Sequence, residues 1–182
     1  SEFVETLPRE VRGRTKATLA FGVTYVPGMV PLQLAGPLTA SLRVAAEEAI
    51  SFDAGVVNAD RLVSKPNCLC DGRKLLLIDH EMALHVAGRG WLVRDPWTPD
   101  ALAHMSMGRS EHLFYRELKK SRPDQPAVKV DSFVTRLEAI TSSRITEYRE
   151  AIPPEWDQDG VPDEIAGFLR ELIANARGLG RE

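Results

Sequence analysis

The feature that most constrains the fold is an Asp-Gly pair set between two short apolar runs. Cys68-Leu69-Cys70 comes before Asp71-Gly72, and Leu75-Leu76-Leu77-Ile78 follows it. Asp-Gly is a strong short-range signal for a β-hairpin, because both residue types tolerate the left-handed backbone that a tight turn requires. The sequence therefore predicts an antiparallel hairpin in this part of the chain.

The regions around the hairpin have a helical pattern, which predicts a mainly helical α+β fold. After Pro37, apolar residues recur every three or four positions, as on the buried face of a helix. That stripe includes Leu42, Ala45, Ala46, Ala49 and Ile50, and either Phe52 or Asp53 continues it. The predicted helices cover residues 39–57, 98–120, 129–141, 143–151 and 162–177.

Length and composition predict a single domain with a real core. The chain has 182 residues, of which 43% are hydrophobic and 27% charged, as is usual for a globular domain. Aromatic and β-branched residues between Phe21 and Val26 predict one short strand, followed by an extended segment. We divide the chain into an expression-tag remnant and lead-in (1–18), an extended segment of the kind that joins two lobes (19–38), a main lobe (39–178) and a tail (179–182).

Charge and cysteine content exclude several classes of protein. With 23 basic and 26 acidic side chains the net charge is -3, so we expect no direct binding to nucleic acid. A disulfide between Cys68 and Cys70 would be strained, which favours a reducing, cytoplasmic location. The uncharged run Ala17–Leu42 is long enough to cross a bilayer, but its glycines and prolines exclude a single membrane helix.

Polar residues gather before, within and after the hairpin. Asp60 and Arg61 follow the first long helix, Asn67 precedes the first strand, and Asp79 ends the second. Phosphoryl transfer to a hydroxyl needs a carboxylate that orients and accepts the proton, and oxygen ligands for magnesium. If the hairpin loop centres on Arg73, Asn67 and Asp79 lie level with each other, although a shared ion does not require that register.

The run VVNADRLVSKPNCLCDGRKLLLIDHEMAL resembles the catalytic segment of HipA-like bacterial kinases, which reads roughly Asn-x-Asp-Arg, Asn-Pro-Asn, a hairpin and Ile-Asp-His. The resemblance implies the C-terminal lobe of a kinase, with ATP and Mg²⁺ as cofactors and a hydroxyl-bearing acceptor. By this resemblance Asp60 is the catalytic base, and Asn67 and Asp79 are the metal ligands. Asn58 and Arg61 are assigned to cofactor binding, while the sequence alone favours a role for Asn58 in ending the helix.

Two departures from the family pattern leave two functions open. Lys65 stands where the family often has the first Asn of Asn-Pro-Asn, and only about 18 residues precede the segment that would join the two lobes. The first hypothesis is a kinase C-lobe completed by an N-terminal lobe. The second is a catalytically inactive kinase-like module that binds a partner. In either case we expect an N-lobe protein or a second copy of the chain to contact residues near Tyr25, Met29 and Leu32.

Zinc chemistry is not supported. His80 and His85 are five positions apart, so on a helix their side chains would point about 140° apart. Cys68 and Cys70 with His80 could be imagined as ligands, but small buried strand residues are the better interpretation of the two cysteines. His112 is expected to be a surface or packing residue.

Overall fold

The computed structural model describes most of the chain that follows its N-terminal region. The described residues are 24–34, 36–58, 60–80, 82–84, 95–98, 112–121, 130–157 and 160–179. They form the predicted α+β fold, in which helices accompany a small antiparallel sheet of strand order β1-β2-β3. The predicted lead-in at 1–18 lies outside the described residues.

The predicted hairpin is confirmed. Its strands are β2 (Cys68–Cys70) and β3 (Leu75–Leu77), with Cys68 opposite Leu77 and Cys70 opposite Leu75. Both cysteines are buried and carry free thiols, as expected for small strand residues.

The hairpin loop is four residues long and is closed by its first side chain. The Asp71 carboxylate accepts hydrogen bonds from the backbone N–H groups of Arg73 at 2.8 Å and Lys74 at 2.7 Å. The loop therefore centres just before Arg73, and Asn67 lies level with Ile78, whose N–H donates to the Asn67 carbonyl at 3.0 Å. Asp79 is one residue beyond that pair.

The strand expected between Phe21 and Val26 is absent from the described part of that run, residues 24–26. The third strand is instead β1 (Val30–Pro31), which pairs with β2 at the edge of the sheet. Pro31 is tolerated there because an edge strand can lack one N–H donor. Leu32, which follows, donates its N–H to the Cys68 carbonyl at 3.0 Å and is buried.

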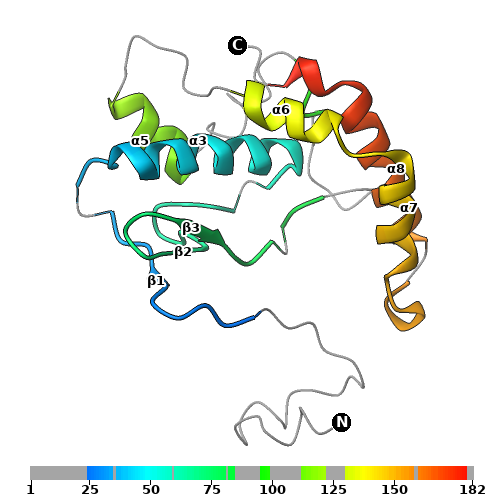
Figure 1. Cartoon of the computed structure of the whole chain (residues 1–182), viewed down its shortest axis with the longest axis horizontal. Coiled ribbons are helices and arrows are strands. Elements are labelled where there is room, and N and C mark those ends of the chain that lie inside the picture. Colours follow the sequence, from blue (N-terminus) through cyan, green and yellow to red (C-terminus); the bar gives the residue numbers. More distant parts are fainter. Residues whose placement is uncertain are drawn as a thin grey trace, which may run out of the picture.

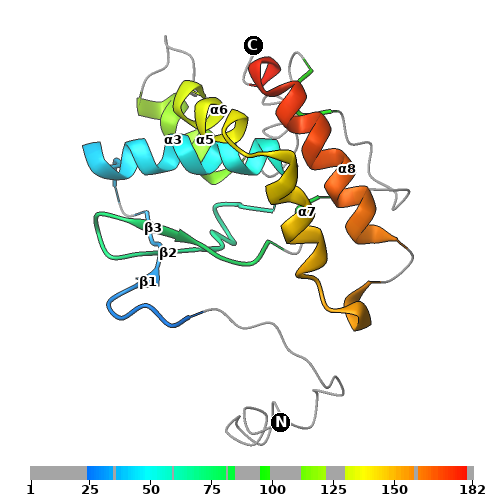
Figure 2. The same cartoon turned by 45° about the vertical axis from the view of Figure 1, so that its right-hand side comes forward.

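Helix α3 (Ala40–Gly55) is the centre of the fold. Thr39 caps it, its hydroxyl accepting a hydrogen bond from the Leu42 N–H at 3.3 Å. In both views α3 lies between the sheet on one side and α6 on the other (Figure 1, Figure 2). The buried core residues that it shares with the sheet and α5 are Leu32, Leu38, Leu42, Ala46, Ala49, Ile50, Ala54, Cys68, Cys70, Leu113, Phe114 and Leu118.

The predicted C-terminal helices are confirmed to within a few residues. They are α6 (Asp131–Glu138), α7 (Ser142–Glu150) and α8 (Val161–Ala174), with short 3₁₀ turns η1 (Pro154–Trp156) and η2 (Ala176–Gly178). Helices α6 and α8 share a second core around Leu137 and Leu172, to which Leu179 also belongs. At Gly55, the last residue of α3, the space that a Cβ would occupy is 3.3 Å from the ring of Phe133 on α6.

The helix predicted over 98–120 can be compared with the structure only at its two ends. Thr98 closes a turn by donating its N–H to the Asp95 carbonyl at 3.0 Å, and α5 spans Leu113–Ser121. Residues 99–111 lie outside the described residues. Among the helices that the structure describes, none combines the length and apolar character needed to cross a membrane.

Candidate functional site

The loop that carries the predicted site begins at a left-handed helix end. Asn58 donates its N–H to the Asp53 carbonyl at 2.8 Å, and Val57 donates its N–H to the Ala54 carbonyl at 3.3 Å. These two bonds form a Schellman motif, in which the left-handed position is usually glycine. Here it is Val57, with φ 56°, so a β-branched residue holds a conformation that it normally avoids.

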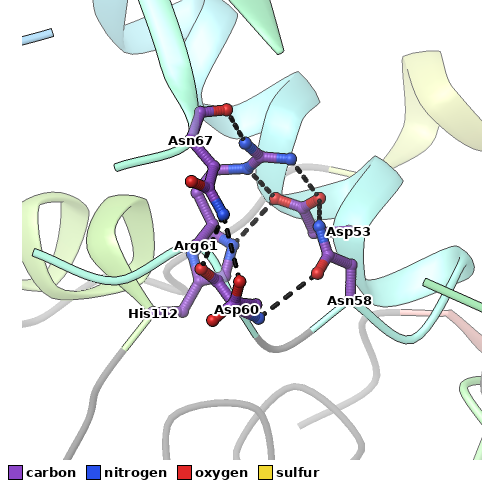
Figure 3. Close-up of polar contacts among 6 residues, drawn as sticks. All are labelled: Asp53, Asn58, Asp60, Arg61, Asn67 and His112. Atoms are coloured by element: carbon purple, nitrogen blue, oxygen red, sulfur yellow. Dashed lines mark hydrogen bonds and ion pairs between the residues drawn. The ribbon is translucent and has the colours of Figure 1, made fainter. Parts of the chain in front are cut away.

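Directly after this helix end lies a fully buried ion pair. Arg61 donates from Nε to Asp53 Oδ2 at 2.5 Å and from Nη2 to Asp53 Oδ1 at 2.9 Å (Figure 3). Arg61 also donates from Nη1 to the Asn67 carbonyl. One guanidinium thereby ties the end of α3 to the start of β2.

Two further buried side chains complete the Asp53 environment. His112 Nε2 lies 2.9 Å from Asp53 Oδ2, and Asn58 Nδ2 donates to Asp53 Oδ1 at 3.0 Å. Asp53, Asn58, Arg61 and His112 all have 0% exposure. Burial by itself raises the pKa of Asp53, but the hydrogen bonds from His112 and Arg61 and their charges outweigh it, so the pKa lies below its ordinary value.

The ionised Asp53 accepts a hydrogen bond from the His112 ring. A carboxylate can only accept hydrogen bonds, so Nε2 of His112 carries the proton that is shared with Asp53. Nδ1 of the same ring is buried without a hydrogen-bond partner. The backbone at this position also meets the loop, since Leu113 donates its N–H to the Arg61 carbonyl at 2.8 Å.

The structure brings Asp60, Asn67 and Asp79 together through one further residue, Lys65. Lys65 Nζ is 2.7 Å from Asp60 Oδ2 and 3.4 Å from Asp79 Oδ2. Asn67 Nδ2 donates to the carbonyl of Asp60 at 3.2 Å and to its Oδ2 at 3.1 Å. The hydrogen bond with Asp60, followed by that with Asp79, raises the pKa of Lys65 above its ordinary value.

Backbone geometry holds the two predicted metal ligands in place. Asn67 has φ 48° and Asp79 has φ 55°, both in the left-handed region. Asn and Asp tolerate this region better than other residues with a Cβ, and non-glycine residues in it concentrate at functional sites. The two residues flank the hairpin at its open end, where the Ile78 N–H bonds to the Asn67 carbonyl.

Asn58 and Arg61, the two residues assigned to cofactor binding, are buried beneath Asp60. Asn58 uses its side chain within the protein, donating to Asp53 and accepting from the Asp60 N–H at 3.2 Å. Arg61 faces Asp53 and the Asn67 carbonyl. Their role in the structure is to hold the loop that presents Asp60, and the helix-ending role expected for Asn58 is also present.

A pocket of about 610 Å³ lies next to Lys65 and Asn67, and neither Asp60 nor Asp79 is among its lining residues. It lies between the extended segment, the loop and the hairpin, and it is lined largely by apolar side chains, including Leu32, Leu34, Leu69, Ile78 and Leu113. Lys65 and Asn67 also line it and connect it to Asp60. Its volume is in the range of small-molecule sites.

The residues as arranged do not fit a magnesium ion between Asp60 and Asp79. Mg²⁺ requires oxygen ligands at about 2.0–2.1 Å in a near-octahedral arrangement. The ammonium of Lys65 already lies against both carboxylates. Nor do the described residues contain a group of three or more His, Cys, Asp or Glu side chains that could hold a metal.

Sequence analysis missed two members of the buried group, Asp53 and His112. A signal for Asp53 was present, because a carboxylate on the apolar stripe of a helix must find a buried partner, and Arg61 is the nearest basic residue in the sequence. His112, expected to be a surface or packing residue, is 59 positions away from Asp53, and no local pattern connects them.

The comparisons with known proteins returned nothing for this chain: no protein-family model matches it, and neither does a curated protein or a solved structure.

Proposed function

We propose that the chain is the C-terminal lobe of a kinase-type phosphotransferase that transfers the γ-phosphoryl group of ATP to a hydroxyl acceptor. The observation that carries this proposal is the position of Asp60, a half-buried carboxylate that is hydrogen-bonded to Lys65 and Asn67 in the lining of a pocket of nucleotide size. The order of helix, loop, hairpin and acid supports it, as does the resemblance of residues 52–85 to HipA-like kinases.

In this proposal the pocket takes the base and sugar of ATP. Apolar side chains such as Leu34, Leu69 and Ile78 offer flat contact surfaces, and Lys65 and Asn67 meet the polar end of the ligand. Asp60 orients the acceptor hydroxyl and takes its proton as the oxygen–phosphorus bond forms and the bond to ADP breaks. Catalysis of this kind consists mainly of positioning and charge stabilisation.

An N-terminal lobe, from the same protein or a partner, would complete the nucleotide site. Such lobes carry the phosphate-contacting lysine and the cover over ATP. The exposed apolar side chains of the extended segment support a contact there, since Tyr25 is 80% and Val30 60% exposed. Leu32, which we expected in that contact, belongs instead to the core of this chain.

The deciding experiment is a titration of the ¹⁵N-labelled chain with ATP, followed by amide chemical shifts. We expect weak binding with shift changes concentrated in residues 32–34, 63–65, 67–69 and 78. An Asp60→Asn variant should keep those changes and lose phosphoryl transfer in the presence of the N-lobe. Shift changes that avoid the pocket, or none at millimolar ATP, would refute the proposal.

A second candidate function is a kinase-like module that binds a partner without catalysis. Lys65 favours it, because its ammonium engages both Asp60 and Asp79. The two functions differ in the ATP titration, since a module that has lost the nucleotide site produces no pocket shifts.

A further inference from the structure

An internal cation lies where two carboxylates converge. Lys65 Nζ contacts Asp60 Oδ2 at 2.7 Å and Asp79 Oδ2 at 3.4 Å, and the three side chains are partly exposed. The Lys65 backbone is fixed by reciprocal hydrogen bonds with Leu62, at 3.0 Å and 3.2 Å. The ammonium is therefore directed to the carboxylates from a closed turn.

A divalent ion that bound between Asp60 and Asp79 would have to displace the Lys65 ammonium. Displacement would break the contacts of Lys65 with Asp60 and Asp79 and bring the ammonium and the metal ion, both positively charged, close together. A lysine is a compact, strongly hydrated point charge, so it can neutralise neighbouring carboxylates without the geometry that a metal demands. The sequence itself gives the same indication, because Lys65 is five residues after Asp60, where the resembling kinases often have Asn.

We propose that Lys65 is the built-in cation of this site, so that Asp60 and Asp79 bind no divalent metal ion while Lys65 is in place. A second part of the inference rests on the proposed function: the phosphates of ATP meet the Lys65 ammonium, and nucleotide binding by this lobe does not require Mg²⁺.

The first test measures Mn²⁺ binding by electron paramagnetic resonance, without nucleotide. The variants are Lys65→Asn, which supplies an amide oxygen in place of the ammonium, and Lys65→Asn combined with Asp79→Asn. We expect Lys65→Asn to bind Mn²⁺ at least about tenfold more tightly than the wild-type chain, because removing a positive charge raises the affinity of a carboxylate site. The double variant should lose that gain.

Two results would overturn the inference. In the first, the wild-type chain binds Mn²⁺ as tightly as Lys65→Asn does, and Asp79→Asn alone weakens that binding. The metal ion would then displace the Lys65 ammonium. The other is no gain in Lys65→Asn while its amide spectrum remains that of the folded chain. The wild-type measurement does not depend on whether the variant folds.

The second test repeats the ATP titration with Mg²⁺ and with a chelator. We expect the same dissociation constant in both conditions for the wild-type chain. A dissociation constant at least about tenfold lower with Mg²⁺ would refute metal-independent binding and still support the proposed kinase function. Absence of ATP binding in both conditions would refute the proposed function, and the Mn²⁺ result would stand.

Discussion

Asp53 at the end of α3 and Arg61 in the following loop form a bidentate ion pair that is completely buried. The same guanidinium bonds to the Asn67 carbonyl, so the helix end, the loop and the first hairpin strand have one common anchor. The position of Asp60 follows from this arrangement, since Asp60 is the residue immediately before Arg61 and its N–H bonds to Asn58.

Replacing Arg61 by Met should destabilise the chain severely. The change keeps an apolar stem and removes the charge, which leaves the Asp53 carboxylate buried with His112 and Asn58 as its side-chain partners among the described residues. Breaking a buried pair in this way costs about 3–5 kcal/mol. Urea unfolding measures the loss.

The matched control for Arg61→Met is Arg136→Met. Arg136 pairs with Glu48 at 3.0 Å on the surface, and an exposed pair contributes less than about 1 kcal/mol. Equal and small losses in both variants would show that the buried pair is not the anchor described above.

The left-handed backbone of Val57 at the end of α3 predicts that a glycine variant is more stable than an alanine variant. Val57→Gly should be more stable than Val57→Ala by about 1 kcal/mol, because glycine alone adopts φ near 56° without a Cβ penalty. Both variants lose the valine methyl groups, so their difference isolates the backbone. An alanine variant as stable as the glycine variant would contradict the Schellman geometry.

Asp53 gives the stability a defined pH dependence. Its folded-state pKa is below the ordinary value of 3.8, so the unfolded chain takes up this proton first as the pH falls. The contribution of Asp53 is therefore fully present above pH 3.8 and is lost as the pH falls through the folded-state pKa. Urea unfolding at decreasing pH should show this decline in the free energy of unfolding. The ¹³C chemical shift of the Asp53 carboxyl group should still be that of the ionised form just below pH 3.8.

Asp71 and Asp163 also have lowered pKa values, from backbone hydrogen bonds of Lys74 and Arg73 and from the side chain of Arg149 respectively. An Asp71→Asn, Asp163→Asn double variant is therefore the control and should retain the part of the decline that belongs to Asp53. If the free energy of unfolding of that variant increased as the pH fell, the folded-state pKa of Asp53 would lie above its ordinary value, contrary to this prediction.

Cys68 should be almost inert to thiol reagents in the folded chain. Burial raises the pKa of its thiol to about 11, so at pH 8 only about 0.1% is thiolate. In a Cys70→Ala variant, Cys68 is the single thiol, and its labelling should follow the opening of the hairpin and become fast in urea. Rapid labelling under native conditions would mean that β2 is not buried as described.

Local signals were enough to predict α3, the three C-terminal helices and the hairpin. The hairpin was predictable because Asp71 and Gly72 determine the turn through their own backbone and side-chain bonds. The strand β1 at Val30–Pro31 was not predicted, because the pairing of these two residues with β2 is a long-range contact that local strand propensity does not indicate.

The buried polar group could not be derived in full from the sequence. Asp53 and Arg61 are eight residues apart and could have been paired by the need to neutralise a buried carboxylate. His112 joins them only because α5 packs against α3, a tertiary contact without a local pattern. The contact of Lys65 with Asp79 likewise depends on how the hairpin folds back.

Gly55 has a mechanical consequence for the candidate site. It is the last residue of α3, two positions before the strained Val57, and Phe133 of α6 lies against the place where a side chain would begin. A hydrogen atom against an aromatic ring is thus a point of contact between the C-terminal helices and the loop that presents Asp60. A side chain at position 55 would begin 3.3 Å from the Phe133 ring, so the close packing of α6 against the end of α3 depends on glycine at this position.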